Sequence, residues 1–234
     1  MHKGKLIGVG TGPGDPELVS RKAWSRISHA KVIAYPAADS GTSFARSIVS
    51  EAISDDVLEI EMKVPMRTGR KPAQDIYDEG AAAISAQLDK GHDVVVLCEG
   101  DPLFYGSFMY ILARLREAYE VEVVPGITAM TACASAMAHP LVAREDMMTI
   151  MPATMSDDEL RTAIASSQGV AIMKVGRHIN RLRDLLAEMS CLDKAIYVSH
   201  ASLPHQVSCA LVDAPDDAPY FSMILLYKGD DPWI

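Results

Sequence analysis

The sequence has no long apolar run, since no stretch reaches the roughly 18 residues that a membrane-spanning helix needs. Its first residues, 1–5 (MHKGK), also lack the apolar segment of a secretory signal peptide. With 49% hydrophobic and 23% charged residues, the composition is typical of a globular protein with a sizeable core. We therefore expect a cytoplasmic protein without a membrane partner.

Cysteine is also scarce, and the few thiols do not form a recognisable site. None of the four cysteines forms a C-x-x-C pair or clusters with the seven histidines. Metal sites and disulfide frameworks normally need such spacing. We therefore expect no bound metal, and we interpret Cys98, Cys133, Cys191 and Cys209 as small buried residues in a reducing compartment.

Positive charge is in deficit over the chain, whose formal net charge is −9. This balance argues against nucleic acid as a partner, and a polyanionic substrate would need a local basic patch. Two basic clusters are either ordinary solvated charge or carboxylate-binding surfaces on which arginine offers two parallel donors. They comprise Lys63, Arg67, Arg70 and Lys71 in one segment, and Arg177, His178 and Arg181 in another.

Familiar catalytic motifs are missing. The chain contains no G-x-S-x-G and no H-E-x-x-H, and it shows no pair of catalytic carboxylates. The segment 8–16 (GVGTGPGDP) spaces its glycines differently from G-x-G-x-x-G, and no P-loop lysine follows it. Pro13 also removes a backbone donor that a phosphate cradle would use. The residues alone therefore predict no nucleophile and no phosphate site.

Strands and helices alternate along the chain, which predicts an α/β protein. The first half favours a parallel, doubly wound sheet, and the pattern restarts after 139–142 (HPLV) with a tail that favours a mixed sheet with an antiparallel edge. We therefore expect one α/β domain over 1–141 and a second over 142–234. The expected strands are 5–10, 31–35, 57–62, 93–97, 121–124, 148–151, 169–175, 194–199, 206–212 and 220–228, and the expected helices are 17–30, 43–54, 73–90, 107–116, 128–137, 156–166 and 178–189.

Three turns rich in glycine and proline, 8–16, 98–106 and 125–129, each follow an expected strand of the first sheet. Ligands of open parallel sheets bind just outside the carboxyl ends of the strands. The turns would then lie side by side and bind something the size of adenosine through backbone groups. Simpler interpretations remain for each: a structural turn at 8–16, a cap of the next helix by Asp101, and a tight turn at 125–129.

The same three turns resemble one family. The stretches 8–18 (GVGTGPGDPEL), 99–106 (EGDPLFYG) and 124–129 (VPGITA) are similar, in order and spacing, to motifs of the tetrapyrrole methyltransferases. The resemblance covers essentially the whole chain. It implies two α/β domains with a cleft between them, S-adenosylmethionine as methyl donor, a tetrapyrrole substrate and a homodimer.

Within the family, four stretches look most like the methyltransferases that act at carbon 20 of precorrin-2 and give precorrin-3A in cobalamin biosynthesis. They are 35–37 (YPA), 65–66 (PM), 98–110 (CEGDPLFYGSFMY) and 201–204 (ASLP). Three alternatives remain open: a cobalt-loaded substrate, another macrocycle position or substrate such as uroporphyrinogen III, and a non-catalytic protein that binds a tetrapyrrole or a nucleotide.

The resemblance also assigns roles to single residues. Lys174 and Ala201 depart from the family pattern, which often has glycine at both positions. The substrate's carboxylates are expected at Arg67 and Arg70, and the candidates for a base are Tyr105 and His200. The cofactor contacts fall on Pro13, Glu99, Gly100, Asp101, Phe104, Thr128, Ala129, Met173 and Ala201.

Overall fold

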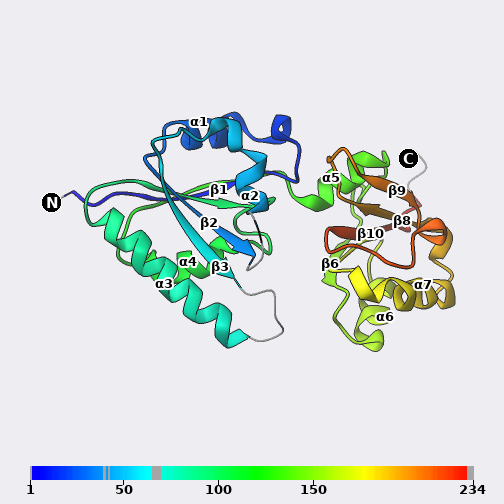
Figure 1. Cartoon of the computed structure of the whole chain (residues 1–234). Helices are drawn as coiled ribbons and strands as arrows, with labels where there is room; N and C mark the ends of the chain where they lie inside the picture. Colours follow the sequence, from blue (N-terminus) through cyan, green and yellow to red (C-terminus); the bar gives the residue numbers. More distant parts are fainter. Residues whose placement is uncertain (1, 39–40, 42, 65–69, 231–234) are drawn as a thin grey trace. The chain divides into compact units, whose positions relative to one another are not determined.

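The structure is a computed structural model that describes residues 2–38, 41, 43–64 and 70–230. The chain divides into two compact units, Met1–Thr128 and Ala129–Ile234, and each contains one sheet with helices (Figure 1). The division comes before the boundary expected between 141 and 142. The reason is helix α5 (Ala129–Ala136), whose Ala132, Cys133 and Ala134 pack in the core of the second unit.

The sheet of the first unit is parallel, with strand order β3-β2-β4-β1-β5. Its central strands β4 and β1 are buried along their whole length, which fits a sheet covered on both faces. The alternation of strand and helix in the sequence therefore predicts this half correctly. The strands are β1 (Leu6–Gly10), β2 (Val32–Ala38), β3 (Leu58–Val64), β4 (Val94–Cys98) and β5 (Val121–Val124).

Helices cover both faces of this sheet (Figure 1). On one face lie α1 (Arg21–Ser28) and α2 (Phe44–Ile48), followed by the short helix η2 (Ser50–Ala52). On the other face lie α3 (Arg70–Leu88) and α4 (Phe108–Leu115). Side chains alternate along the strands, so that Val96 faces α3 and α4 whereas Leu97 faces α1 and α2.

The helix expected over 17–30 is split in the structure. Asp15 and Pro16 begin a short helix, η1 (Pro16–Leu18), in which the Asp15 carboxylate accepts the Glu17 N–H at 2.8 Å. The chain then turns extended, and Ser20 caps α1 by accepting the Ala23 N–H at 3.1 Å. This second cap is not evident from the sequence, because a serine within an apolar pattern resembles continued helix.

Proline does not end β2 as expected. The strand continues past Pro36 to Ala38, paired with β3 along its full length but with β4 only as far as Ala34. Beyond Ala34, β2 forms no hydrogen-bonded pairs with β4. The missing N–H of Pro36 therefore interrupts no pairing between these two strands.

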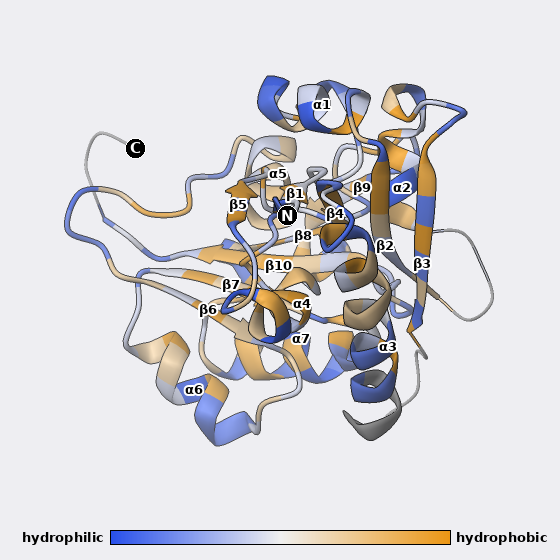
Figure 2. Cartoon of the chain, turned by 90° about the vertical axis from the view of Figure 1, so that its left-hand side faces the viewer, coloured by the Kyte–Doolittle hydropathy of each residue, from blue (hydrophilic) through white to orange (hydrophobic). Residues whose placement is uncertain are grey.

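The second unit holds a mixed sheet with strand order β6-β7-β10-β8-β9. Strand β10 (Ser222–Tyr227) is antiparallel to both β7 (Gly169–Met173) and β8 (Ala195–Ser199). The sequence predicted a mixed sheet with an antiparallel strand at its edge. In the structure the antiparallel strand β10 lies at the centre of the sheet and is almost wholly buried. Figure 2 shows β10 as a largely apolar ribbon. The outer strands are β6 (Met148–Pro152) and β9 (Val207–Ala210).

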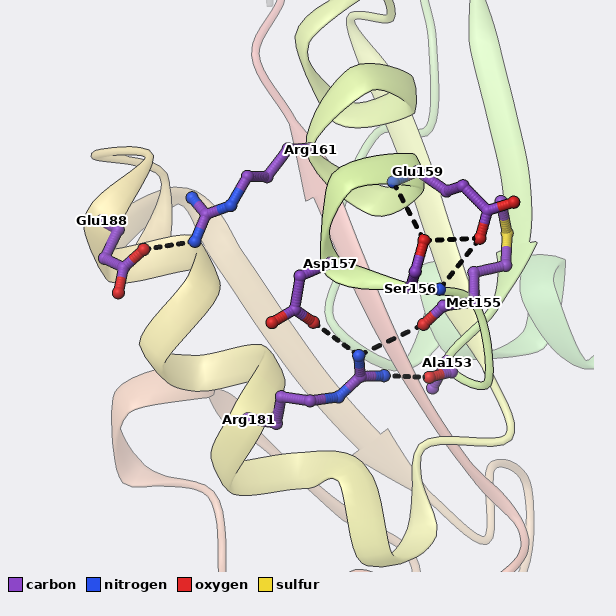
Figure 3. Close-up of polar contacts among 8 residues, drawn as sticks. All are labelled: Ala153, Met155, Ser156, Asp157, Glu159, Arg161, Arg181 and Glu188. Carbon is purple, nitrogen blue, oxygen red and sulfur yellow. Dashed lines mark hydrogen bonds and ion pairs between the residues drawn. The ribbon is translucent and has the colours of Figure 1, made fainter.

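Helix α5 packs on one face of this sheet, and α6 (Asp157–Ala165) and α7 (Ile179–Glu188) pack on the other. The short helices are η3 (Gly176–His178), η4 (Leu192–Lys194) and η5 (Leu211–Asp213). The predicted capping box at the start of α6 is present: Ser156 accepts the Glu159 N–H, and the Glu159 carboxylate accepts the Ser156 N–H at 2.9 Å (Figure 3).

Arg181 of α7 joins this turn from the other side. Its guanidinium donates to the carbonyls of Ala153 and Met155 and pairs with Asp157 at 2.5 Å (Figure 3). Arg181 is therefore held by internal contacts, and of the second basic cluster only Arg177 and His178 remain as a candidate carboxylate-binding surface.

Two further observations concern the described residues. Cys98, Cys133 and Cys191 are buried and Cys209 is partly buried, and all four are free thiols. Within the described ranges, no helix is both long enough and apolar enough to cross a bilayer.

Candidate functional site

The turns that follow β1 and β4 are joined by backbone hydrogen bonds. The N–H and the hydroxyl of Thr11 both donate to the Cys98 carbonyl, at 2.8 and 3.0 Å. Gly12 and Gly100 exchange a pair of bonds, in which the Gly100 N–H donates over 2.8 Å and the Gly12 N–H over 3.2 Å. Thr11 is not evident as a site residue from the sequence, because its bond to Cys98 joins residues 87 positions apart.

Asp101 joins the turn after β5 to the same group. One carboxylate oxygen accepts the Leu103 N–H at 2.9 Å, and the other accepts the Gly126 N–H at 3.0 Å. The interpretation of Asp101 as a cap of the next helix is wrong, because α4 begins only at Phe108. Asp101 instead fixes its own turn and holds the neighbouring one. The three turns lie side by side, as the sequence predicted.

Glycine is needed where these turns touch. A side-chain carbon on Gly10 would lie 2.5 Å from the Gly100 oxygen, and one on Gly126 would lie 2.0 Å from that same oxygen. Gly12 and Gly100 have φ angles of 76° and 61°, a region that other residues rarely adopt. The three turns therefore meet through bare backbone, and side chains at these positions would force them apart.

Glu99 places a carboxylate at this edge. It forms no hydrogen bond or ion pair with the part of the chain that the structure describes, although the residue keeps exposed surface. Desolvation by the surrounding protein raises the pKa of its carboxyl group. An unpaired, partly desolvated carboxylate suits a cationic or hydroxyl-bearing ligand, since either would stabilise the charged form.

Apolar side chains flank the backbone edge. Leu103 and Tyr105 are about half exposed, and the rings of Phe104 and Tyr105 meet edge to face at 5.2 Å between centroids. Tyr105 has a φ of 55°, which is unusual for a bulky residue and tends to occur at functional sites. The first unit thus offers backbone groups, the unpaired carboxylate of Glu99 and two adjoining aromatic rings.

The second unit has a comparable edge. Because β7 and β8 are both antiparallel to β10, their carboxyl ends lie at the same edge of the sheet. Three residues just beyond those ends have positive φ: Lys174 at 58°, His200 at 50° and Ser202 at 68°. Met173 and Ala201, expected to contact the cofactor, lie at this edge; Ala201 is 8% exposed. The strained backbone marks the edge as a candidate site.

His200 belongs to a small ring cluster at the same edge. Its imidazole lies 4.3 Å from that of His205 and 6.3 Å from the Phe221 ring, measured between centroids. Burial, and next the charge of His205, lower the pKa of His200. The neutral imidazole is therefore favoured, and it can accept a proton. Sequence reasoning named His200 but missed His205, five positions further along the chain, because no sequence pattern shows that the two rings meet.

The expected site residues are divided between the two units, and each group is described within its own unit. Arg67 lies outside the described residues, and so does the side chain of Arg70, whose backbone begins α3. Among the described residues, no group of three or more His, Cys, Asp or Glu side chains could hold a metal ion. The first unit contains Pro13, Glu99, Gly100, Asp101, Phe104 and Thr128, and the second contains Ala129, Met173 and Ala201.

Comparison with known proteins decides the family. The sequence model of the tetrapyrrole (corrin/porphyrin) methylases matches residues 5–211, which is most of the chain. The chain belongs to this family. The three joined turns of the first unit are therefore the turns of a tetrapyrrole methylase.

Two curated methylases resemble the chain over nearly its full length. A precorrin-2 C(20)-methyltransferase from Sinorhizobium sp is 41% identical, and the match covers 95% of each chain. A cobalt-precorrin-2 C(20)-methyltransferase from Salmonella typhimurium is 29% identical and covers 96% of this chain and 97% of the relative. The similarity therefore spans both units.

The fold agrees with solved methylases. A uroporphyrin-III C-methyl transferase from Thermus thermophilus, solved with S-adenosylhomocysteine, has a TM-score of 0.66 at 22% identity. The match covers 96% of this chain and 92% of that structure. It supports the parallel first sheet and the mixed second sheet as the fold of the family.

Proposed function

We propose that the chain transfers a methyl group from S-adenosylmethionine to carbon 20 of precorrin-2, giving precorrin-3A in cobalamin biosynthesis. The observation that carries this proposal is the 41% identity with a precorrin-2 C(20)-methyltransferase over 95% of both chains. The stretch 98–110, which begins at the last residue of β4, adds the local signature that carries the sequence resemblance.

The first unit fits S-adenosylmethionine as the methyl donor. Gly10 and Gly126 let the three turns meet backbone to backbone, so the proposed contacts with adenosine are made largely by backbone groups, and the edge has no phosphate-binding motif. The unpaired Glu99 carboxylate would attract a cationic ligand or accept hydrogen bonds from its hydroxyl groups. The proposed contacts are Pro13, Glu99, Gly100, Asp101, Phe104 and Thr128 in the first unit, and Ala129, Met173 and Ala201 in the second.

The proposed chemistry needs no protein nucleophile. When bound, S-adenosylmethionine supplies a methyl group already activated by its sulfonium. The chain's own residues would align the electron-rich substrate carbon with that group and exclude water. The carbon that gains the methyl group then loses a proton, and His200 accepts it in our proposal because its neutral form is favoured. Tyr105, at the edge of the first unit, is the second candidate base.

The remaining parts of the proposal concern the substrate and the assembly. We place substrate carboxylates at Arg67 and Arg70, on the ground of the basic segment in an acidic chain. Replacing both arginines with alanine should weaken substrate binding and slow the reaction, and unchanged values would refute that placement. A homodimer follows from the family resemblance, and a cytoplasmic location agrees with four free thiols.

Methyl transfer from labelled S-adenosylmethionine tests the proposed function. Parallel reactions would contain precorrin-2, cobalt-loaded precorrin-2, uroporphyrinogen III, or no tetrapyrrole. We expect label in precorrin-2. Label only in the cobalt-loaded substrate or in uroporphyrinogen III would assign a different methylation step. Binding of S-adenosylmethionine without transfer to any acceptor would favour the non-catalytic alternative.

A further inference from the structure

The second unit contains a long basic segment. Between Glu159 and Asp184 the chain has no acidic residue, although its overall net charge is −9. The cations of this segment are Arg161, Lys174, Arg177, Arg181 and Arg183.

Three of these cations are paired with carboxylates. Arg161 pairs with Glu188 and Arg181 with Asp157 (Figure 3), and Arg183 pairs with Asp216 at 2.8 Å. These charges are locally compensated, so they contribute little to an anion-binding surface.

Lys174 and Arg177 lie close together in sequence, at one end of the second sheet. Both are exposed in the turn that leaves the carboxyl end of β7. Arg177 forms no hydrogen bond or ion pair with any residue in the described ranges. The positive field is felt by the neighbouring His178, whose pKa is lowered by burial and then by the charges of Arg181 and Arg177. A negative ligand would relieve this repulsion.

Lys174 is also held in an unfavourable backbone conformation. Its φ of 58° is one that glycine adopts without strain and lysine rarely adopts. Strain of this kind tends to persist where a side chain is needed at a defined place.

We propose that Lys174 and Arg177 bind carboxylate groups of the tetrapyrrole substrate. The inference rests on the proposed function, because it takes the ligand to be a tetrapyrrole that carries several carboxylates. Lysine supplies a mobile point charge, and arginine supplies two parallel donors that match a carboxylate. The turn lies at the same sheet edge as His200, and only β10 separates β7 from β8. Two strand spacings amount to about 10 Å, so one large substrate can meet both turns.

The test is a binding titration of the purified full chain with uroporphyrin III, a porphyrin with eight carboxylates, followed by fluorescence. The variants are Lys174→Gln with Arg177→Gln, and Lys174→Arg with Arg177→Lys, which keeps both charges. The matched control is Arg21→Gln with Lys31→Gln, which removes an exposed arginine and an exposed lysine from the first unit. Thermal unfolding and S-adenosylmethionine binding of each variant show that the fold is retained.

We expect the charge-removing pair to weaken uroporphyrin III binding by about tenfold or more, since each hydrogen-bonded carboxylate loses its cation. Its binding should also depend less on salt. The charge-keeping pair should bind nearly as the native chain, and the control should change by less than about twofold. Binding by the charge-removing pair that equals the control would overturn the inference.

The proposed function is tested separately by methyl transfer with the same proteins. If the native chain methylates precorrin-2 while the charge-removing pair binds uroporphyrin III normally, the carboxylate site is refuted and the function stands. If the native chain neither binds the porphyrin nor transfers a methyl group to a tetrapyrrole, both proposals fail.

Discussion

Asp101 makes two backbone contacts at once. Its two oxygens accept N–H groups from Leu103 and Gly126, so its carboxylate joins the turns after β4 and β5. An asparagine can satisfy only one of these donors with its oxygen, because its amide group presents hydrogens to the other.

We therefore expect Asp101→Asn to destabilise the chain by about 1–3 kcal/mol, the cost of leaving a backbone donor without its partner. Binding of S-adenosylmethionine should weaken as well, because the turns around the proposed site are less fixed. Urea unfolding and calorimetric titration measure the two effects. Asp55→Asn, in an exposed loop, serves as the control and should leave both values unchanged.

Burial lowers the pKa of His200, and the charge of His205 lowers it further. Replacing His205 with alanine should raise the pKa of His200 toward its ordinary value of 6.5, because a neighbouring positive charge is removed. An NMR titration of the His200 ring measures this. His92→Ala, in the first unit, should have no effect. If the His200 titration is the same in His205→Ala and the native chain, the two rings do not interact as the structure indicates.

The same shift has a consequence for stability. Since the folded chain holds the pKa of His200 below its unfolded value, the folded state binds fewer protons near pH 6.5. Above pH 6.5 His200 is mostly neutral in both states, so it does not reduce the unfolding free energy. As the pH falls, the unfolded state binds the proton more readily, and the unfolding free energy decreases. The unfolding free energy should therefore decline less steeply on acidification in His200→Gln than in the native chain. A steeper decline in the variant would contradict the sign.

The turns after β1, β4 and β5 pack together through close contacts between their backbones. Adding a methyl group at Gly10 would place it 2.5 Å from the Gly100 oxygen, so Gly10→Ala must push the turns after β1 and β4 apart. We expect a loss of about 1–3 kcal/mol in unfolding free energy, together with weaker binding of S-adenosylmethionine. Gly41→Ala is a suitable control, because no described residue lies within 4 Å of the added carbon. Equal behaviour of the two variants would show that the close contact is unimportant.

In the second unit, Arg181 secures the turn between β6 and α6 (Figure 3). Arg181→Met should cost about 1–3 kcal/mol, since two backbone carbonyls and Asp157 lose their donor. Arg161→Met removes only a solvent-exposed pair with Glu188 and should cost less than about 1 kcal/mol. Thermal unfolding compares them directly, and a larger loss in Arg161→Met would contradict the assigned roles.

At the scale of elements, local chemistry explains what could be predicted. The capping box at Ser156 and the three turns each depend on residues that are close in sequence. Local sequence patterns therefore predicted them. The second cap at Ser20 was missed because an N-cap within an apolar pattern looks like continued helix. The contact of Asp101 with Gly126 joins residues that are distant in sequence, and no local pattern announces it.

Across the whole molecule, the order of strands was the hardest feature to foresee. Alternating strands and helices imply parallel neighbours, which held for the first sheet. The last strand, β10, instead lies between β7 and β8. A central position suits this strand because it carries apolar residues on both faces. That Lys174 and His200 lie at the same edge of this sheet therefore became apparent only from the topology.

The most direct test of the central claim is the structure of the product formed from precorrin-2 and S-adenosylmethionine carrying a ¹³C-labelled methyl group. We predict a product with one added methyl group, and NMR should place the labelled carbon on carbon 20 of the macrocycle. A labelled methyl group on any other carbon, or no labelled product while S-adenosylmethionine binds, would contradict the proposed function.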